Sequence, residues 1–121
     1  MSLSDEVYTA LNAKLGYAPD PADDTSATYK PLVPGKIFLY FGKESEGEGP
    51  WLGFWVHSEV SKYLRDCLKV ELHNIAATTN KVSDIYDDDV WVYGTIITGT
   101  VDWIVSTMEE LERRAKFEID K

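Results

Sequence analysis

Apolar residues recur along the chain with two different spacings, and these spacings predict which segments are helical and which are extended. Val7, Leu11 and Leu15 lie four residues apart, which places them on one face of a helix that spans about 5–15. Gly16 follows directly and is a typical helix stop. The N-terminal segment is therefore predicted to be a short amphipathic helix.

Two aromatic segments in the first half of the chain are predicted to be strands. Residues 36–42 (KIFLYFG) and 51–57 (WLGFWVH) are rich in aromatic and β-branched side chains, and the polar, Gly-rich segment 43–50 separates them. The first strand does not alternate with polar residues, which favours burial of both its faces. The simplest pairing of the two strands is an antiparallel hairpin.

A second amphipathic helix is predicted to follow Ser58, which has the chemistry of an N-cap. Apolar residues keep helical spacing over 60–68, and the same face continues to Ala76. Residues 70–75 also alternate as a strand does, so the end of this helix has two interpretations. We favour the longer helix.

The last third of the chain predicts one strand and one helix. Residues 90–98 are rich in β-branched and aromatic side chains, which favours a strand. Thr100 is the expected N-cap of the final helix. The apolar stripe of that helix consists of Val101, Ile104, Val105, Met108, Leu111 and Ala115.

The intervening segments are predicted to be loops. Residues 17–35 are rich in proline and aspartate without a repeating period, and residues 77–89 are polar. The expected fold is therefore α+β, with a small antiparallel sheet of three or four strands packed by helices in the order α-β-β-α-β-α. A length of 121 residues corresponds to a single domain, 1–121, in which 17–35 links the N-terminal helix to the body.

Charge narrows the expected partners. The chain has 21 Asp+Glu against 12 Lys+Arg, a formal net charge of -9. Such a charge repels nucleic acid and anionic membranes and attracts basic surfaces. The lone Cys67 fits a reducing compartment, and no apolar run approaches the roughly 20 residues of a membrane span. We expect a cytoplasmic protein with a basic protein partner and no direct contact with nucleic acid or membrane.

The sequence offers little catalytic chemistry. A Cys-rich zinc site is excluded by the single cysteine, and the acidic segment 84–89 lacks the ligand spacing of a calcium loop. No nucleophile elbow or Gly-rich phosphate loop occurs. We therefore expect no cofactor, no metal and no catalytic residue. The alternative is a small enzyme that uses His57 or His73 with a nearby carboxylate.

Two acidic segments border aromatic strands, and this arrangement suggests a binding surface in which rings supply contact area and carboxylates steer association. The predicted function is a non-enzymatic protein-binding module, an inhibitor or immunity protein that neutralises a basic, nucleic-acid-acting partner such as a toxin nuclease or defence effector. A homodimeric adaptor or secretion-type chaperone is the second hypothesis. The predicted partner-binding residues are Asp84, Asp87, Asp88, Asp89, Trp91 and Tyr93, with Glu44, Glu46 and Glu48 as a secondary patch.

Overall fold

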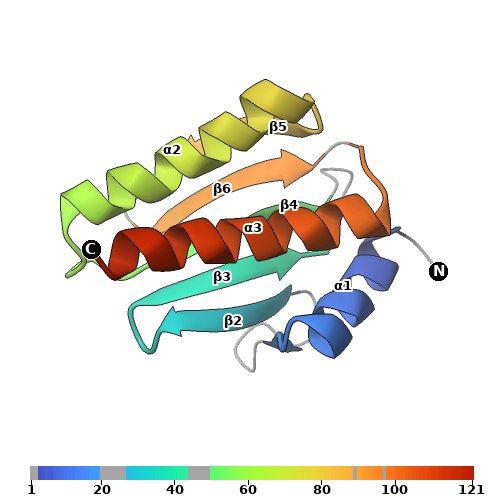
Figure 1. Ribbon diagram of the computed structural model, residues 1–121, viewed down its shortest axis with the longest axis horizontal. Helices are drawn as coiled ribbons and strands as arrows, with labels where there is room; N and C mark the ends of the chain where they lie inside the picture. Colours follow the sequence, from blue (N-terminus) through green and yellow to red (C-terminus); the bar gives the residue numbers. More distant parts are fainter. Residues whose placement is uncertain (1–2, 20–26, 44–49, 89, 97) are drawn as a thin grey trace.

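Helices and strands succeed one another in the order α-β-β-β-β-α-β-β-α. The computed structural model describes residues 3–19, 27–43, 50–88, 90–96 and 98–121, and within these ranges the strands form one six-stranded antiparallel sheet (Figure 1). The elements are α1 (Leu3–Lys14), β1 (Ala18–Pro19), β2 (Ala27–Val33), β3 (Ile37–Gly42), β4 (Trp51–Val56), α2 (Lys62–Thr79), β5 (Val82–Asp87), β6 (Trp91–Ile96) and α3 (Val101–Ile119).

The strand order across the sheet is β1-β2-β3-β4-β6-β5. Strands β1 to β4 follow one another as neighbours, and every neighbouring pair is antiparallel. Helix α2 then connects β4 to β5 at the far edge, and β6 returns to pair with β4. The predicted sheet of three or four strands in the order α-β-β-α-β-α is therefore wrong, because β1, β2 and β5 were not predicted.

Strand β2 lies inside the predicted loop 17–35. Pro31 belongs to β2, and proline is normally excluded from central strands because it lacks an N–H. In the described residues β1 pairs only with Thr28 and Tyr29, so no β1 residue pairs with Pro31 on that side. The missing N–H therefore costs no bond to β1, and proline is tolerated.

Strand β5 lies inside the second predicted loop, 77–89. It is the edge strand, and its register against β6 shifts between Val82 and Ile85. Edge strands tolerate charged side chains and irregular pairing because one side of their backbone faces solvent. The segment VSDIYD was therefore predicted to be a loop because it is polar, although it forms a strand.

The helix ends follow local capping chemistry. The longer form of the second helix is confirmed, since α2 runs to Thr79 and ends at Asn80 in the left-handed conformation. Its N-cap is Ser61, whose side chain accepts a hydrogen bond from the N–H of Leu64, and not the predicted Ser58. Thr100 caps α3 as predicted, by accepting from the N–H of Trp103.

The core lies between the helices and one face of the sheet. All three described helices cover that face, with α2 over β5 and β6 and α1 beside β2 and β3 (Figure 1). Alternate residues of the central strands point toward the helices and are fully buried, as a pleated strand requires. The buried side chains include Ile37, Leu39, Phe41, Leu52, Phe54, Val56 and Val92 from the sheet and Leu11, Leu68, Leu72, Ile104, Met108 and Leu111 from the helices.

Candidate functional site

The other face of the sheet carries aromatic side chains. On β3, Phe38 and Tyr40 alternate with the buried aliphatic positions, so they point away from the helices. The same alternation holds on β4 and β6. We call this surface the aromatic face, and it consists of Tyr29, Phe38, Tyr40, Trp51, Trp55, Tyr86, Trp91 and Tyr93.

Strand register aligns these side chains in rows across the sheet. One row runs from Phe38 through Trp55 to Trp91. A neighbouring row runs from Tyr29 to Tyr40, Gly53, Tyr93 and Tyr86. Among the paired residues of these described rows there is no Asp, Glu, Lys or Arg. The centre of the face is therefore an uncharged surface.

The rings contact one another as a continuous layer. Tyr40 and Trp91 are in edge contact with centroids 4.9 Å apart, and Trp51 meets Trp91 at 5.6 Å. At the β5 edge Tyr86 and Tyr93 are stacked at 5.1 Å. These offset and edge-on geometries are the favourable ones for aromatic pairs. The rings of the central strands are consequently half-buried by one another, although the described residues place no helix over them.

Two glycines make room for this layer. A Cβ atom on Gly42 would lie 1.9 Å from Cε2 of Trp51, so the indole ring rests directly on the glycine backbone. A Cβ atom on Gly53 would lie 2.4 Å from the carbonyl oxygen of Val92. Neither position accepts a side chain without displacement of its neighbour. The sequence therefore uses glycine to bring ring and backbone into close approach.

Asp84 is the predicted acidic residue that lies at the border of the aromatic face. It is exposed on the edge strand β5, and its Oδ2 accepts a hydrogen bond of 3.4 Å from the Tyr86 hydroxyl. Trp91 and Tyr93, also predicted, lie in the centre of the face. These three predicted binding residues lie on one face of the sheet, and a fourth, Asp88, is hydrogen-bonded to the backbone of Trp91.

Asp87 is engaged on the opposite side of the sheet. Its carboxylate forms ion pairs with Arg65 and with Lys69, whose Nζ is 3.0 Å away, and both partners belong to α2. The hydrogen bond from Arg65, assisted by that from Lys69, holds the pKa of Asp87 below its ordinary value. These contacts give Asp87 a structural role in joining β5 to α2.

Asp88 holds the turn between β5 and β6. Its Oδ1 accepts hydrogen bonds from the backbone N–H groups of Val90 and Trp91, at 2.9 and 2.8 Å. An Asp side chain that bonds the backbone two and three residues ahead is a common turn device. Four other predicted residues, Asp89, Glu44, Glu46 and Glu48, lie outside the described residues.

The prediction omitted most of the aromatic face. Tyr29, Phe38, Tyr40, Trp51, Trp55 and Tyr86 were not among the predicted site residues. A signal was present in the sequence, because aliphatic and aromatic residues alternate within 37–40 and 91–94. The prediction that 36–42 is buried on both faces is not borne out, because Phe38 and Tyr40 are only half-buried. Hydrophobicity alone does not separate the two sides. The alternation of aromatic and aliphatic residues separates them at 37–40, but not at Phe41 and Phe54, which are aromatic and lie in the core.

His57 lines a shallow hollow of about 450 Å³ with Ser58, Val60, Lys62 and Arg65. No carboxylate lines this hollow in the described part of the chain, and Nδ1 of His57 accepts the N–H of Glu59. His73 is exposed on α2. Within the described ranges no group of His, Cys, Asp and Glu has the arrangement of a metal site. These contacts add no support to the enzymatic alternative.

Comparisons with known proteins identify no relative of this chain. No protein-family model, no curated protein and no solved structure matches the chain. Among the described residues, no helix combines the length and apolar character needed to cross a membrane.

Proposed function

We propose that this protein is a non-enzymatic binding module that holds a basic segment of a partner protein on its aromatic face. The observation that carries the proposal is the continuous, uncharged ring layer on a sheet face that no described helix covers. Contiguous apolar surface of this kind is typical of interaction sites. Trp and Tyr are also the residues most often found at the energetic centre of interfaces.

The charge of the molecule favours a basic occupant. A net charge of -9 attracts cationic partners and accelerates their encounter. Arg and Lys side chains also bind the faces of Trp and Tyr rings, with about 0.5–2 kcal/mol per contact. Asp84, at the border of the face, is placed to pair with a cation whose neighbours lie on the rings.

Nucleic acid is a poor alternative occupant. Aromatic sheet faces do stack unpaired bases in RNA-binding domains. Such domains also supply Lys and Arg for the phosphates, whereas the rows of the aromatic face contain none in the described strands. We therefore retain, as a proposal, an inhibitor or immunity protein whose partner is itself basic and acts on nucleic acid.

Peptide binding tests the proposal directly. The probe is a synthetic peptide in which arginine alternates with leucine, and the control peptide has glutamate in place of arginine. Trp103 lies on α3, so a Trp103→Phe background leaves Trp51, Trp55 and Trp91 as reporters of the aromatic face. We expect the arginine peptide to change their fluorescence, with affinity that falls as salt rises, and the glutamate peptide to have no effect.

Substitutions locate the binding surface. Trp91→Ala is expected to weaken binding of the arginine peptide by roughly tenfold or more, as for a central interface residue. Asp84→Asn should weaken binding of the same peptide by a smaller factor. Binding that is unchanged by Trp91→Ala, or equal for both peptides, would remove the aromatic face as the site.

The nucleic-acid-acting class of partner needs a separate experiment. Basic proteins captured from lysate at low salt should be released by added DNA or RNA if their nucleic-acid groove is the surface that binds. If nucleic acid does not release the captured basic proteins, the protein still binds basic partners, but the inhibitor proposal is contradicted.

A further inference from the structure

A second apolar surface lies on the outside of the helical layer, away from the sheet. Tyr63 and Val70 on α2 and Phe117 on α3 have exposed fractions of 66%, 54% and 65%. Tyr63 and Val70 are seven residues apart, which places them on one face of α2. We call these three residues the helical patch.

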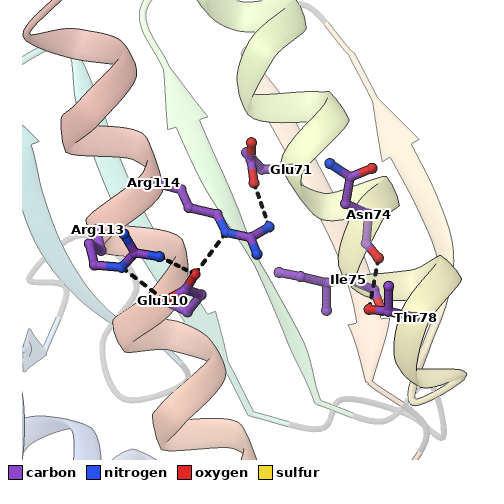
Figure 2. A network of polar contacts seen from close by, with 7 residues as sticks. All are labelled: Glu71, Asn74, Ile75, Thr78, Glu110, Arg113 and Arg114. Carbon is purple, nitrogen blue, oxygen red and sulfur yellow. Dashed lines mark hydrogen bonds and ion pairs between the residues drawn. The ribbon is translucent and has the colours of Figure 1, made fainter.

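Ion pairs span the groove between the two helices. Arg114 on α3 places its Nη1 2.8 Å from Oε2 of Glu71 on α2, and its Nε 2.9 Å from Oε1 of Glu110 (Figure 2). Arg113 binds the same Glu110, with Nε 3.0 Å from Oε2. Hydrogen bonds from Arg113 and then Arg114 lower the pKa of Glu110 to about 2. The charged side chains of the groove are therefore paired with one another.

Ion pairs neutralise most of the charge around the helical patch. Beside Tyr63, Lys62 pairs with Asp66 at 3.2 Å, and beside Phe117, Lys121 pairs with Glu118 at 3.4 Å. Each of these carboxylates, like Glu71 and Glu110, has a cationic partner. The chain as a whole carries a net charge of -9. The surroundings of the patch therefore differ from the average surface of this acidic protein.

The groove also offers space for a side chain. A hollow of about 320 Å³ is lined by Glu71, Arg113, Arg114, Phe117 and Glu118. The aliphatic stems of the arginines and the Phe117 ring give it apolar walls, since long charged side chains cover apolar surface with their stems. A ring from another molecule fits the chemistry of such a hollow.

We propose that the helical patch is where two copies of this chain associate. Two chains of charge -9 repel each other over most of their surfaces, so association requires a region where charge is already neutralised. The helical patch provides that region together with exposed rings. A basic partner gains less there, because four of the carboxylates around the patch already have cationic partners.

Two-fold symmetry explains how one patch serves both copies. In an isologous interface the same residues meet on the two sides, so Tyr63 or Phe117 of one copy can enter the groove of the other. Such a dimer leaves the aromatic face open on each copy. The inference is therefore independent of the proposed function and adds to it a doubled binding surface.

Salt dependence distinguishes this interface from binding of a basic partner. We expect sedimentation velocity to show a concentration-dependent rise in mass from 13.7 kDa toward twice that value. The association should tighten several-fold between low and high salt, because salt screens repulsion between the two acidic chains. Binding of the arginine peptide should change in the opposite direction.

Matched variants locate the interface. Phe117→Glu and, separately, Val70→Glu add a charge at exposed sites, and each is expected to weaken self-association roughly tenfold or more. Tyr86→Glu is the control, because Tyr86 is 45% exposed and lies on the aromatic face. It should leave self-association unchanged. Circular dichroism of each variant confirms that the fold is retained.

Three results would overturn the inference. The first is a monomer at every concentration and salt. The second is a dimer that Tyr86→Glu dissociates, because the aromatic face would then hold the second copy. The third is a dimer that survives both Phe117→Glu and Val70→Glu. Loss of peptide binding with self-association intact would contradict the proposed function alone.

Discussion

The two faces of the sheet are apolar in different ways. On the helical side, Leu39, Leu52 and Phe54 are fully buried beneath α1, α2 and α3. On the other side, Trp55 and Trp91 are half-buried, and their rings contact the rings of neighbouring strands. The side chains of the helical side are removed from water by a second layer of structure, whereas the rings of the other side shield one another within a single layer.

Because of this difference, one face of the sheet stabilises the fold while the other keeps its rings accessible to a partner. Burial of apolar side chains on the helical side stabilises the fold, since each large side chain removed from water contributes about 1.5–3 kcal/mol. The aromatic side keeps part of every ring accessible. A sheet with one face of each kind can therefore hold a stable core and present a preformed binding surface.

Adjacent residues on β4 give the strongest test of this comparison. Phe54→Ala empties a fully buried site and should lower the free energy of unfolding by about 3–5 kcal/mol. Trp55→Ala removes a larger side chain from the aromatic face, where solvent fills the space, and should cost about 1–2 kcal/mol. Urea denaturation measures both. Equal losses would mean that the aromatic face is as integral to stability as the core.

Gly42 tests how tightly the rings are packed. Gly42→Ala forces the Trp51 ring from its position and should lower the free energy of unfolding by about 1–3 kcal/mol. Tryptophan emission should shift to the red as the indole becomes more exposed. In a Trp51→Ala background the same glycine substitution should be nearly neutral. An equal cost in both backgrounds would mean that the strain lies in the backbone and not in the ring.

The pH dependence of a Glu110 variant probes the helical side, and here the smallest effect is expected. The depressed pKa of Glu110 means that its carboxylate stabilises the fold above its ordinary value of 4.5, and this contribution is lost as pH falls toward 2. Glu110→Gln should therefore lower the melting temperature slightly at pH 7, with a difference that disappears near pH 2. Thermal melts at intermediate pH follow this convergence. A difference that persists at pH 2 would assign the effect to packing.

Local chemistry made the helices predictable. Thr100 caps α3 and the apolar face of α2 continues past residue 75, both as the sequence indicates. The capping residues and apolar spacing that indicate a helix lie within a few turns of one another, so they can be recognised without knowledge of the rest of the fold. Strand signals depend on neighbours. Pro31 borders a register shift in the β2–β3 ladder and has no β1 partner in the described chain, and the sequence does not contain that information.

The proposed binding surface was predictable only in part, for a related reason. Acidic residues beside aromatic strands indicated Asp84, Trp91 and Tyr93. Asp84 bonds Tyr86, whose ring stacks on Tyr93, and Trp91 lies on the same sheet face. The same reasoning included Asp87, whose carboxylate binds Arg65 and Lys69 of α2. Those cations precede it by 22 and 18 positions in the sequence. Whether an aspartate faces a partner or an internal cation is decided by tertiary contacts.

The pairing of β4 with β6 has a consequence for how the chain folds. Strands β1 to β4 can assemble by pairing of sequence neighbours, but β6 reaches β4 only after α2 and β5 have been brought round. Closing such a long loop is entropically costly, so formation of this ladder is expected to be late and slow. The row of Phe38, Trp55 and Trp91 crosses the same seam. The aromatic face is thus complete only in a fully folded molecule, so a partner that binds it selects the finished fold.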